Sequence, residues 1–135
     1  MRYMMLIYSK EVPDLAGRDY GSHHALMEEA ARSGVLVAAE PLAPPSSATT
    51  VRIADGKPMI TDGPFAETKE QLGGYYILDC ANLDDAIDWA QKIWTACKRA
   101  DSVEIRPMPG LPARAQVWRP GVEAPRYSGG FLHTR

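Results

Sequence analysis

Apolar residues recur along this chain at two spacings, one typical of strands and one of helices. Short apolar runs with β-branched and aromatic members, and segments that alternate apolar with polar positions, are typical of strands. Asp55-Gly56 is a strong signal for a two-residue turn, so the segments on either side of it should pair as a β-hairpin. Strands are predicted at residues 2–8, 35–39, 49–54, 57–61, 73–80 and 102–107.

Two other segments place apolar residues three and four positions apart, which is the spacing of an amphipathic helix. The first helix is predicted at residues 22–33, where Ser22 can cap the start and Gly34 can end it. The second is expected to begin after Asn82, a good N-cap with Asp85 three residues later. Its expected apolar stripe consists of Leu83, Ala86, Ile87, Ala90, Ile93, Trp94 and Cys97.

The resulting order is strand, helix, strand, hairpin, strand, helix, strand. This order predicts an α+β, ferredoxin-like fold with an inserted β-hairpin, in which one antiparallel sheet carries both helices on one face. The other face of such a sheet is left without cover. A second copy of the chain would cover it most simply, so we expect a homodimer in which two sheets pack face to face, a dimeric α+β barrel.

Composition narrows the class of protein. The chain has 135 residues, 45% of them hydrophobic and 24% charged, with a formal net charge of −2, as expected of one globular domain with no general affinity for nucleic acid. We expect no membrane span and no signal peptide, and therefore a cytoplasmic location in which Cys80 and Cys97 stay thiols. Residues 1–108 would form the domain, and the Pro- and Arg-rich residues 109–135 an arm on this domain or on a partner subunit.

His23 is the best candidate for a general base. It precedes Leu26 and Met27 by three and four residues, so it lies on the buried side of the first predicted helix. The helix N-terminus disfavours imidazolium and keeps the ring able to accept a proton. A core-edge histidine bonded to a backbone carbonyl remains an equal alternative. His24 points elsewhere and is expected to be a surface residue that pairs with Glu28.

Residues 61–76, "TDGPFAETKEQLGGYY", gather turn formers, charges and aromatics. Asp62 can fix the turn through backbone amides, or it can orient His23 as a carboxylate orients a catalytic imidazole. Lys69, together with Phe65 and Tyr75, is a candidate for substrate binding, although an ion pair for Lys69 and core packing for Tyr75 are alternatives. No metal-ligand spacing and no phosphate-binding glycine loop occurs, so we expect neither metal nor nucleotide cofactor.

The segments "MRYMMLIY", "TTVRIADGKPMITDGPFAETKEQLGGYYILDC", "LDDAIDWA" and "VEIRPM" closely resemble the YCII-related family. Within it, the tetrapeptide Asp62-Gly63-Pro64-Phe65 indicates the DGPF branch. The resemblance covers residues 1–108 and implies a ferredoxin-like domain that dimerises into an α+β barrel. It also implies a histidine in the first helix, here His23, and an aspartate as a proposed catalytic pair. The aspartate that follows the second helix in shorter members has no counterpart here, so Asp62 would have to replace it.

Two functions follow as hypotheses. The first is a small cofactor-independent enzyme of lyase or isomerase type that acts on a small aromatic or enolisable molecule, with His23 as the base and Asp62 orienting it. The second is a ligand-binding or regulatory module without catalysis, since relatives are implied to occur fused to or beside sigma-factor domains. A dimer with a purely structural role is a third possibility.

Overall fold

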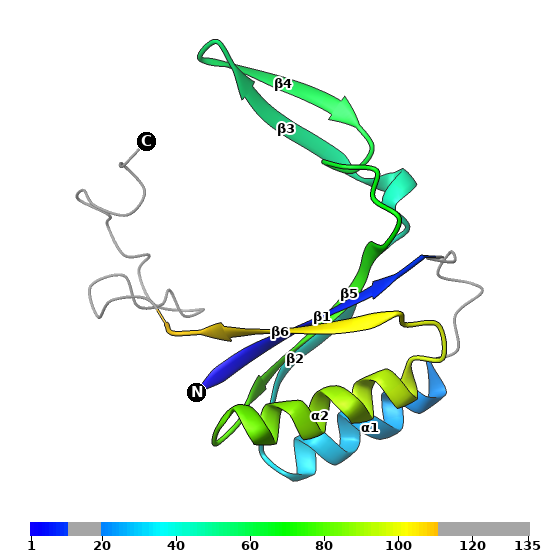
Figure 1. Ribbon diagram of the computed structural model, residues 1–135, viewed down its shortest axis with the longest axis vertical. Coiled ribbons are helices and arrows are strands. Elements are labelled where there is room, and N and C mark those ends of the chain that lie inside the picture. The colour runs from blue at the N-terminus through cyan, green and yellow to red at the C-terminus, as the bar shows by residue number, and fades with distance from the viewer. Residues whose placement is uncertain (11–19, 111–135) are drawn as a thin grey trace, which may run out of the picture.

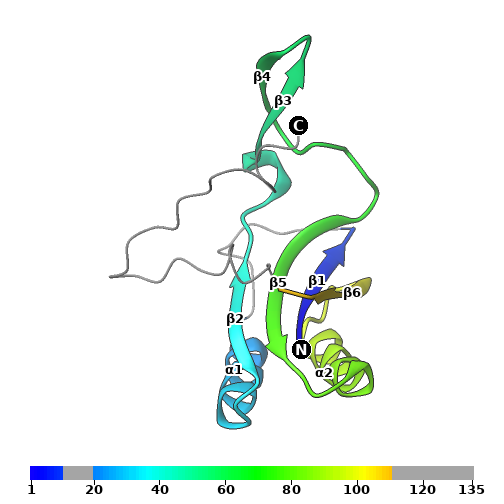
Figure 2. The same ribbon diagram turned by 90° about the vertical axis from the view of Figure 1, so that its left-hand side faces the viewer.

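The computed structural model describes residues 1–10 and 20–110, which form two helices and two antiparallel sheets (Figure 1). The main sheet has the strand order β2-β5-β1-β6, and every neighbouring pair is antiparallel. Both helices lie side by side on one face of this sheet (Figures 1 and 2). The arrangement is compatible with a ferredoxin-like fold. Its elements are β1 (Arg2–Ser9), α1 (Gly21–Arg32), β2 (Leu36–Pro41), β5 (Gln71–Asp79), α2 (Leu83–Ala96) and β6 (Ser102–Met108).

Strict alternation along the two central strands separates the core from the other sheet face. Every second residue of β1 from Tyr3 to Ser9 is buried, and in β5 Tyr76 and Leu78 are buried while their neighbours are not. Successive side chains of a strand point to opposite faces, so the buried set is the one that meets the helices. The fully buried side chains at the centre of this layer include Met5, Leu78 and Ile93.

The opposite face of the main sheet is called the free face here. Leu6 of β1 pairs with Tyr75 of β5, and Met4 pairs with Ile77, and all four side chains are only partly buried. No helix covers this face in the described part of the chain (Figure 1). The free face is therefore apolar at its centre, and residues 1–10 and 20–110 leave it uncovered.

The second helix buries a narrower stripe than the sequence predicted. Its buried residues are Ala86, Trp89, Ala90 and Ile93, spaced three and four apart. Leu83, Ile87 and Trp94, which the prediction placed in the stripe, are exposed, and Trp89 was missing from it. One helix face of about 100° meets the sheet, and apolar residues on its flanks stay in water. The predicted cap is confirmed, since Asn82 accepts a hydrogen bond from the backbone N–H of Asp85.

The start of the first helix differs from the prediction by one residue. Gly21 is the first helical residue and Tyr20 is the N-cap, without a side-chain cap. Ser22 therefore lies inside the helix and does not cap it. Val35 donates a backbone hydrogen bond to Ala30 after Gly34, which has a φ of 76° and ends the helix as predicted.

Two further strands, β3 (Thr49–Ala54) and β4 (Lys57–Asp62), pair as a separate two-stranded antiparallel sheet. The turn between them has positive φ at both Asp55 and Gly56, as a type I′ hairpin turn requires. This hairpin stands on the side of the main sheet away from the helices (Figures 1 and 2). A short 3-10 helix, η2 (Pro45–Ser47), precedes it.

Gly73 and Gly74 of β5 have two separate structural roles. The register of β1 against β5 shifts so that Gly73 is passed over between Gly74 and Leu72, which is a bulge. At Gly74 a Cβ would lie 3.1 Å from the carbonyl oxygen of Glu40 in β2. The edge strand β2 can therefore approach β5 closely at this point.

The difference in burial between the inner face of α2 and its exposed flank gives a stability prediction. Ile93→Ala should lower the free energy of unfolding by about 2–5 kcal/mol, because it leaves a cavity in the closed core. Ile87→Ala removes the same atoms from a side chain that is 38% exposed, so its cost should be clearly smaller. Urea unfolding of the two variants measures this difference, and equal losses would contradict the assigned core.

Candidate functional site

His23 and Tyr76 are joined by a hydrogen bond between the helix layer and the sheet. The Nδ1 atom of His23 lies 2.7 Å from the hydroxyl oxygen of Tyr76, and the contact is partly buried. The two rings are tilted by 35°, with their centroids 6.0 Å apart. This pair is the candidate functional site.

The fold brings the two side chains together from distant parts of the sequence. His23 is the third residue of α1, on the side of the helix that carries the buried Leu26 and Ala30. Tyr76 belongs to the buried set of β5 and reaches toward the helices, with only 4% of its surface exposed. A polar tip on a buried ring needs a partner, and the imidazole provides it.

Burial controls the protonation of Tyr76. Removal from water raises the pKa of Tyr76 from 10.0 to about 12, and the charge of Cys97 adds to the effect in the same direction. Burial disfavours the charged phenolate, so the hydroxyl keeps its proton throughout the physiological pH range. Tyr76 is therefore a neutral partner for His23.

A neutral hydroxyl can either donate to or accept from an imidazole nitrogen, and the two cases have opposite chemical consequences. If Nδ1–H donates to Tyr76, the lone pair of Nε2 can accept a proton. If Tyr76 donates to Nδ1, the neutral ring carries its proton on Nε2 and can only donate there. The tautomer of His23 thus decides whether the site can act as a base.

Tyr75 and His24, the neighbours of the pair, take different positions. Tyr75 points to the free face of the sheet, opposite Leu6, so it is separated from His23 by the sheet itself. His24 is exposed, as the sequence predicted. Tyr75, the predicted substrate-binding residue, and Tyr76 therefore have different surroundings although they are adjacent.

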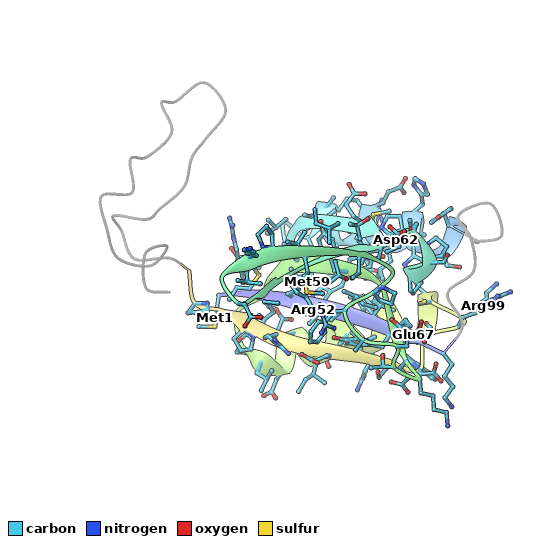
Figure 3. The ribbon with its side chains drawn as sticks, turned by 90° about the horizontal axis from the view of Figure 1, so that it is seen from above. Met1, Arg52, Met59, Asp62, Glu67 and Arg99 are labelled. Atoms are coloured by element: carbon cyan, nitrogen blue, oxygen red, sulfur yellow. The ribbon has the colours of Figure 1, made fainter. Side chains whose placement is uncertain are left out.

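Asp62 comes from another part of the molecule than His23. It is the last residue of β4 and is exposed, and the main sheet lies between the β3–β4 hairpin and α1 (Figures 1 and 3). The fold of one chain thus places the two members of the predicted pair on opposite sides of the sheet. The imidazole is joined to Tyr76 instead.

The turn at residues 62–65 is held against β3. The hydroxyl of Thr50 donates to the carbonyl oxygen of Gly63 at 2.8 Å, and Arg52 donates to that of Phe65 at 2.8 Å. The Arg52 guanidinium also lies 4.9 Å from the centroid of the exposed Phe65 ring. Gly63 has a φ of 99°, which favours glycine at this position. The turn is therefore anchored to β3 by side-chain hydrogen bonds, with Phe65 exposed on its surface.

Lys69, the third predicted substrate-binding residue, lies in the loop between β4 and β5. Lys69 and Glu67 are both exposed there. The same loop is anchored by Gln71, whose side-chain amide donates to the carbonyl oxygen of Thr68 at 2.8 Å. Phe65 and Lys69 thus belong to the hairpin side of the molecule, away from α1 (Figure 1).

Other places in the fold give weaker candidates. An open groove runs between α1 and α2, and across it Lys92 bonds to Glu29 at 2.6 Å and lies 4.5 Å from the centroid of the Trp89 ring. This ion pair is half exposed and contributes little to stability. Cys80 and Cys97 are free thiols, and burial raises the pKa of Cys80.

Residues 1–10 and 20–110 contain no group of three or more side chains arranged to hold a metal ion. In the same residues no helix is long and apolar enough to cross a membrane.

Sequence reasoning did not find Tyr76 as a site residue. The candidate chosen for ligand contact was the adjacent Tyr75. Leu78 and Cys80, which continue the alternation of Tyr76 into the apolar end of the strand, were the available signal. The contact between Tyr76 and His23 was not predictable from this alternation, because the alternation does not give the rotation of α1 about its axis relative to β5.

These features define a two-layer α+β domain with a histidine and tyrosine pair between its layers. The chain belongs to the YCII-related domain family, which it matches over residues 1–109. It is 40% identical over 101 residues to an uncharacterized protein of Rhizobium meliloti (strain 1021), covering 75% of this chain and 79% of the relative. The comparison establishes the family without assigning an activity.

The raised pKa of Tyr76 gives a pH prediction. The proton is held more tightly in the folded chain, so this contribution to stability is complete below pH 10 and is lost as the pH rises toward about 12. It amounts to on the order of 2 kcal/mol. Tyrosinate absorbance after rapid pH jumps should show a late-titrating component, which Tyr76→Phe reduces by one tyrosine and Tyr75→Phe leaves unchanged. A late component of unchanged size in Tyr76→Phe would contradict the assignment.

Proposed function

We propose that this protein is a small cofactor-independent enzyme of lyase or isomerase type, with His23 as the general base. The substrate class is a small aromatic or enolisable molecule. The observation that carries the proposal is the 2.7 Å contact between His23 Nδ1 and the Tyr76 hydroxyl. A histidine whose ring is fixed through one nitrogen can exchange a proton with a substrate through the other.

In this proposal Tyr76 orients the base. Nδ1–H donates to the hydroxyl oxygen of Tyr76, and Nε2 takes a proton from a carbon of the substrate next to a carbonyl or an aromatic ring. The imidazolium that forms keeps its Nδ1–H bond to Tyr76. The N-terminus of α1 disfavours this cation, so the proton is readily returned to another position of the substrate or to the leaving group. Tyr76 thus has the role that the sequence assigned to Asp62.

Asp62, Phe65, Lys69 and Tyr75 stay predictions as site residues. Three of them lie on the hairpin side of the molecule, and Tyr75 lies on the free face. If they bind a ligand, they do so on a surface separate from the His23 pair of the same chain. The proposed chemistry requires only His23 and Tyr76.

We also propose a homodimer of ferredoxin-like domains, each with the β3–β4 hairpin as an insertion. Met4, Leu6, Tyr75 and Ile77 form an apolar centre on the free face of the sheet. Two such faces packed together would hide apolar area that the described residues of one chain leave uncovered. The assembly would be the dimeric α+β barrel expected from the sequence, in a cytoplasmic protein.

The alternative is a ligand-binding or regulatory module without catalysis, with a possible link to a sigma factor. This reading is favoured if Tyr76 donates its proton to Nδ1, because Nε2–H can then hold a ligand but cannot take a proton from it. The Arg-rich arm at residues 109–135, the other feature suggested for a protein partner, lies almost entirely outside the described residues.

A ligand screen followed by turnover assays tests the proposal. Thermal shift with aromatic and enolisable small molecules identifies binders, and those that the protein converts become substrates. His23→Ala should lower kcat by about 10²–10⁴-fold, because general base catalysis contributes that much. The far-ultraviolet circular dichroism spectrum should not change.

His24→Ala is the matched control, because it alters the exposed neighbour on the same helix turn. It should leave kcat unchanged. Full turnover in His23→Ala would remove the base from the proposal. Ligand binding without turnover in the unaltered protein would support the binding module.

A further inference from the structure

The β3–β4 hairpin exposes one continuous apolar face. Val51 is paired with Ile60 and Ile53 with Pro58, and residues directly opposite each other in antiparallel strands share a face. The side chains of Val51, Ile53 and Ile60 are 61%, 63% and 70% exposed, and Pro58 is exposed as well. These four residues are called the hairpin apolar face here.

The opposite face of the hairpin is already in use within the chain. Arg52 and Thr50 of β3 hold the turn at residues 62–65 through their hydrogen bonds to Phe65 and Gly63. Thr61 pairs with Thr50 on this same face. The two faces therefore differ: one, which also carries Met59, contacts the chain's own turn, and the other presents the hairpin apolar face to solvent, with the polar pair Thr49 and Asp62 at its base.

A hairpin of this kind needs cover from elsewhere. β3 and β4 form a sheet of two strands, and no third strand or helix packs on them in the described part of the chain. An isolated two-stranded hairpin is marginally stable in water at best, and needs further strands or a packing partner. The hairpin apolar face is the surface that such a partner would bury.

The position of the hairpin indicates which molecule would cover its apolar face. It stands on the same side of the main sheet as the free face, and seen from above it overlies the sheet (Figures 1 and 3). A molecule seated on the free face would therefore lie beside the hairpin. One partner can cover both apolar surfaces at once.

The area favours use of both surfaces. The four-stranded sheet, with strands of about seven residues, has a projected area of about 450 Å², and the two-stranded hairpin adds about 200 Å². A stable interface buries about 800 Å² on each partner. The sheet face by itself provides little more than half of this area, and the hairpin brings the total much closer.

We propose that the β3–β4 hairpin is an arm that packs its apolar face against a second copy of this chain docked on the free face. The inference rests on the homodimer of the proposed function and assigns the arm to its interface. Because the dimer has a two-fold axis, each chain would pack its own arm against its partner and receive the partner's arm in return. The dimer would therefore contain two equivalent arm contacts. The partner is therefore this chain and not an unrelated protein.

Adjacent residues on opposite hairpin faces provide a matched test. Ile60→Glu places a charge on the apolar face, whereas Thr61→Glu places the same charge one residue away on the other face. Sedimentation across a dilution series measures the dissociation constant of the dimer. Ile60→Glu should raise it by about a hundredfold or more, since two buried isoleucines are lost per dimer, and Thr61→Glu should change it by less than about threefold.

Ile60→Ala is a milder second variant, expected to raise the dissociation constant about tenfold if the Glu variant does not fold. Circular dichroism checks that the main sheet is retained. Equal dissociation constants for both Glu variants in a dimeric protein would overturn the arm and leave the dimer. A protein that is monomeric at all concentrations would overturn both. Neither result affects the role of His23, which is read from turnover.

Discussion

The alternation of side chains along β1 and β5 is the constraint on which the rest of the structure depends. In a strand each side chain is committed to one face, so Met5, Tyr76 and Leu78 must meet the helices while Leu6 and Tyr75 must not. A shift of one residue in this register would exchange the two sets completely. The core, the histidine partner and the uncovered face all follow from it.

The same alternation explains why His23 has a neutral hydroxyl as its hydrogen-bond partner. Tyr76 is the one hydroxyl that the buried set of β5 carries into the layer between sheet and helices. Burial keeps the Tyr76 hydroxyl neutral. This hydroxyl contacts His23 in the first turn of α1, where the helix N-terminus disfavours imidazolium. A neutral partner stabilises imidazolium less than a carboxylate would, and the proposed base would have to release its proton again within each turnover.

The outward set of the two strands has the opposite consequence. Leu6, Tyr75 and their neighbours form an apolar surface on the side where the hairpin stands, and the hairpin adds an apolar face of its own. The described part of one chain covers neither surface. The proposed assembly with a second copy and the proposed reaction at His23 would thus use the two opposite faces of one sheet.

Much of the fold was predictable from local patterns. The turn at Asp55-Gly56 and the cap at Asn82 each depend on a few neighbouring residues, and both are confirmed. Ser22 was a wrong cap because the helix begins one residue earlier. The α2 stripe was too wide because apolar content alone does not say which flank meets the sheet.

The site was harder to predict, since it depends on how elements pack. His23 was recognised as a candidate from its place on α1. Its contact with Tyr76 depends on the rotation of that helix over β5, which no local pattern encodes. Asp62 was a candidate either for fixing the turn or for orienting His23, and it lies at the end of β4 in the hairpin, on the other side of the sheet from α1 (Figure 3). Spacing along the chain contains no information about that distance.

The position of the proton on the neutral His23 ring decides whether this residue can act as a base through Nε2. Long-range proton–nitrogen correlation spectra of the protein, at a pH where the ring is neutral, distinguish a protonated Nδ1 from a protonated Nε2. The account predicts that Nδ1 carries the proton and donates it to Tyr76, and that Tyr76→Phe shifts the proton toward Nε2. A proton on Nε2 in the unaltered protein would contradict the role of His23 as a base.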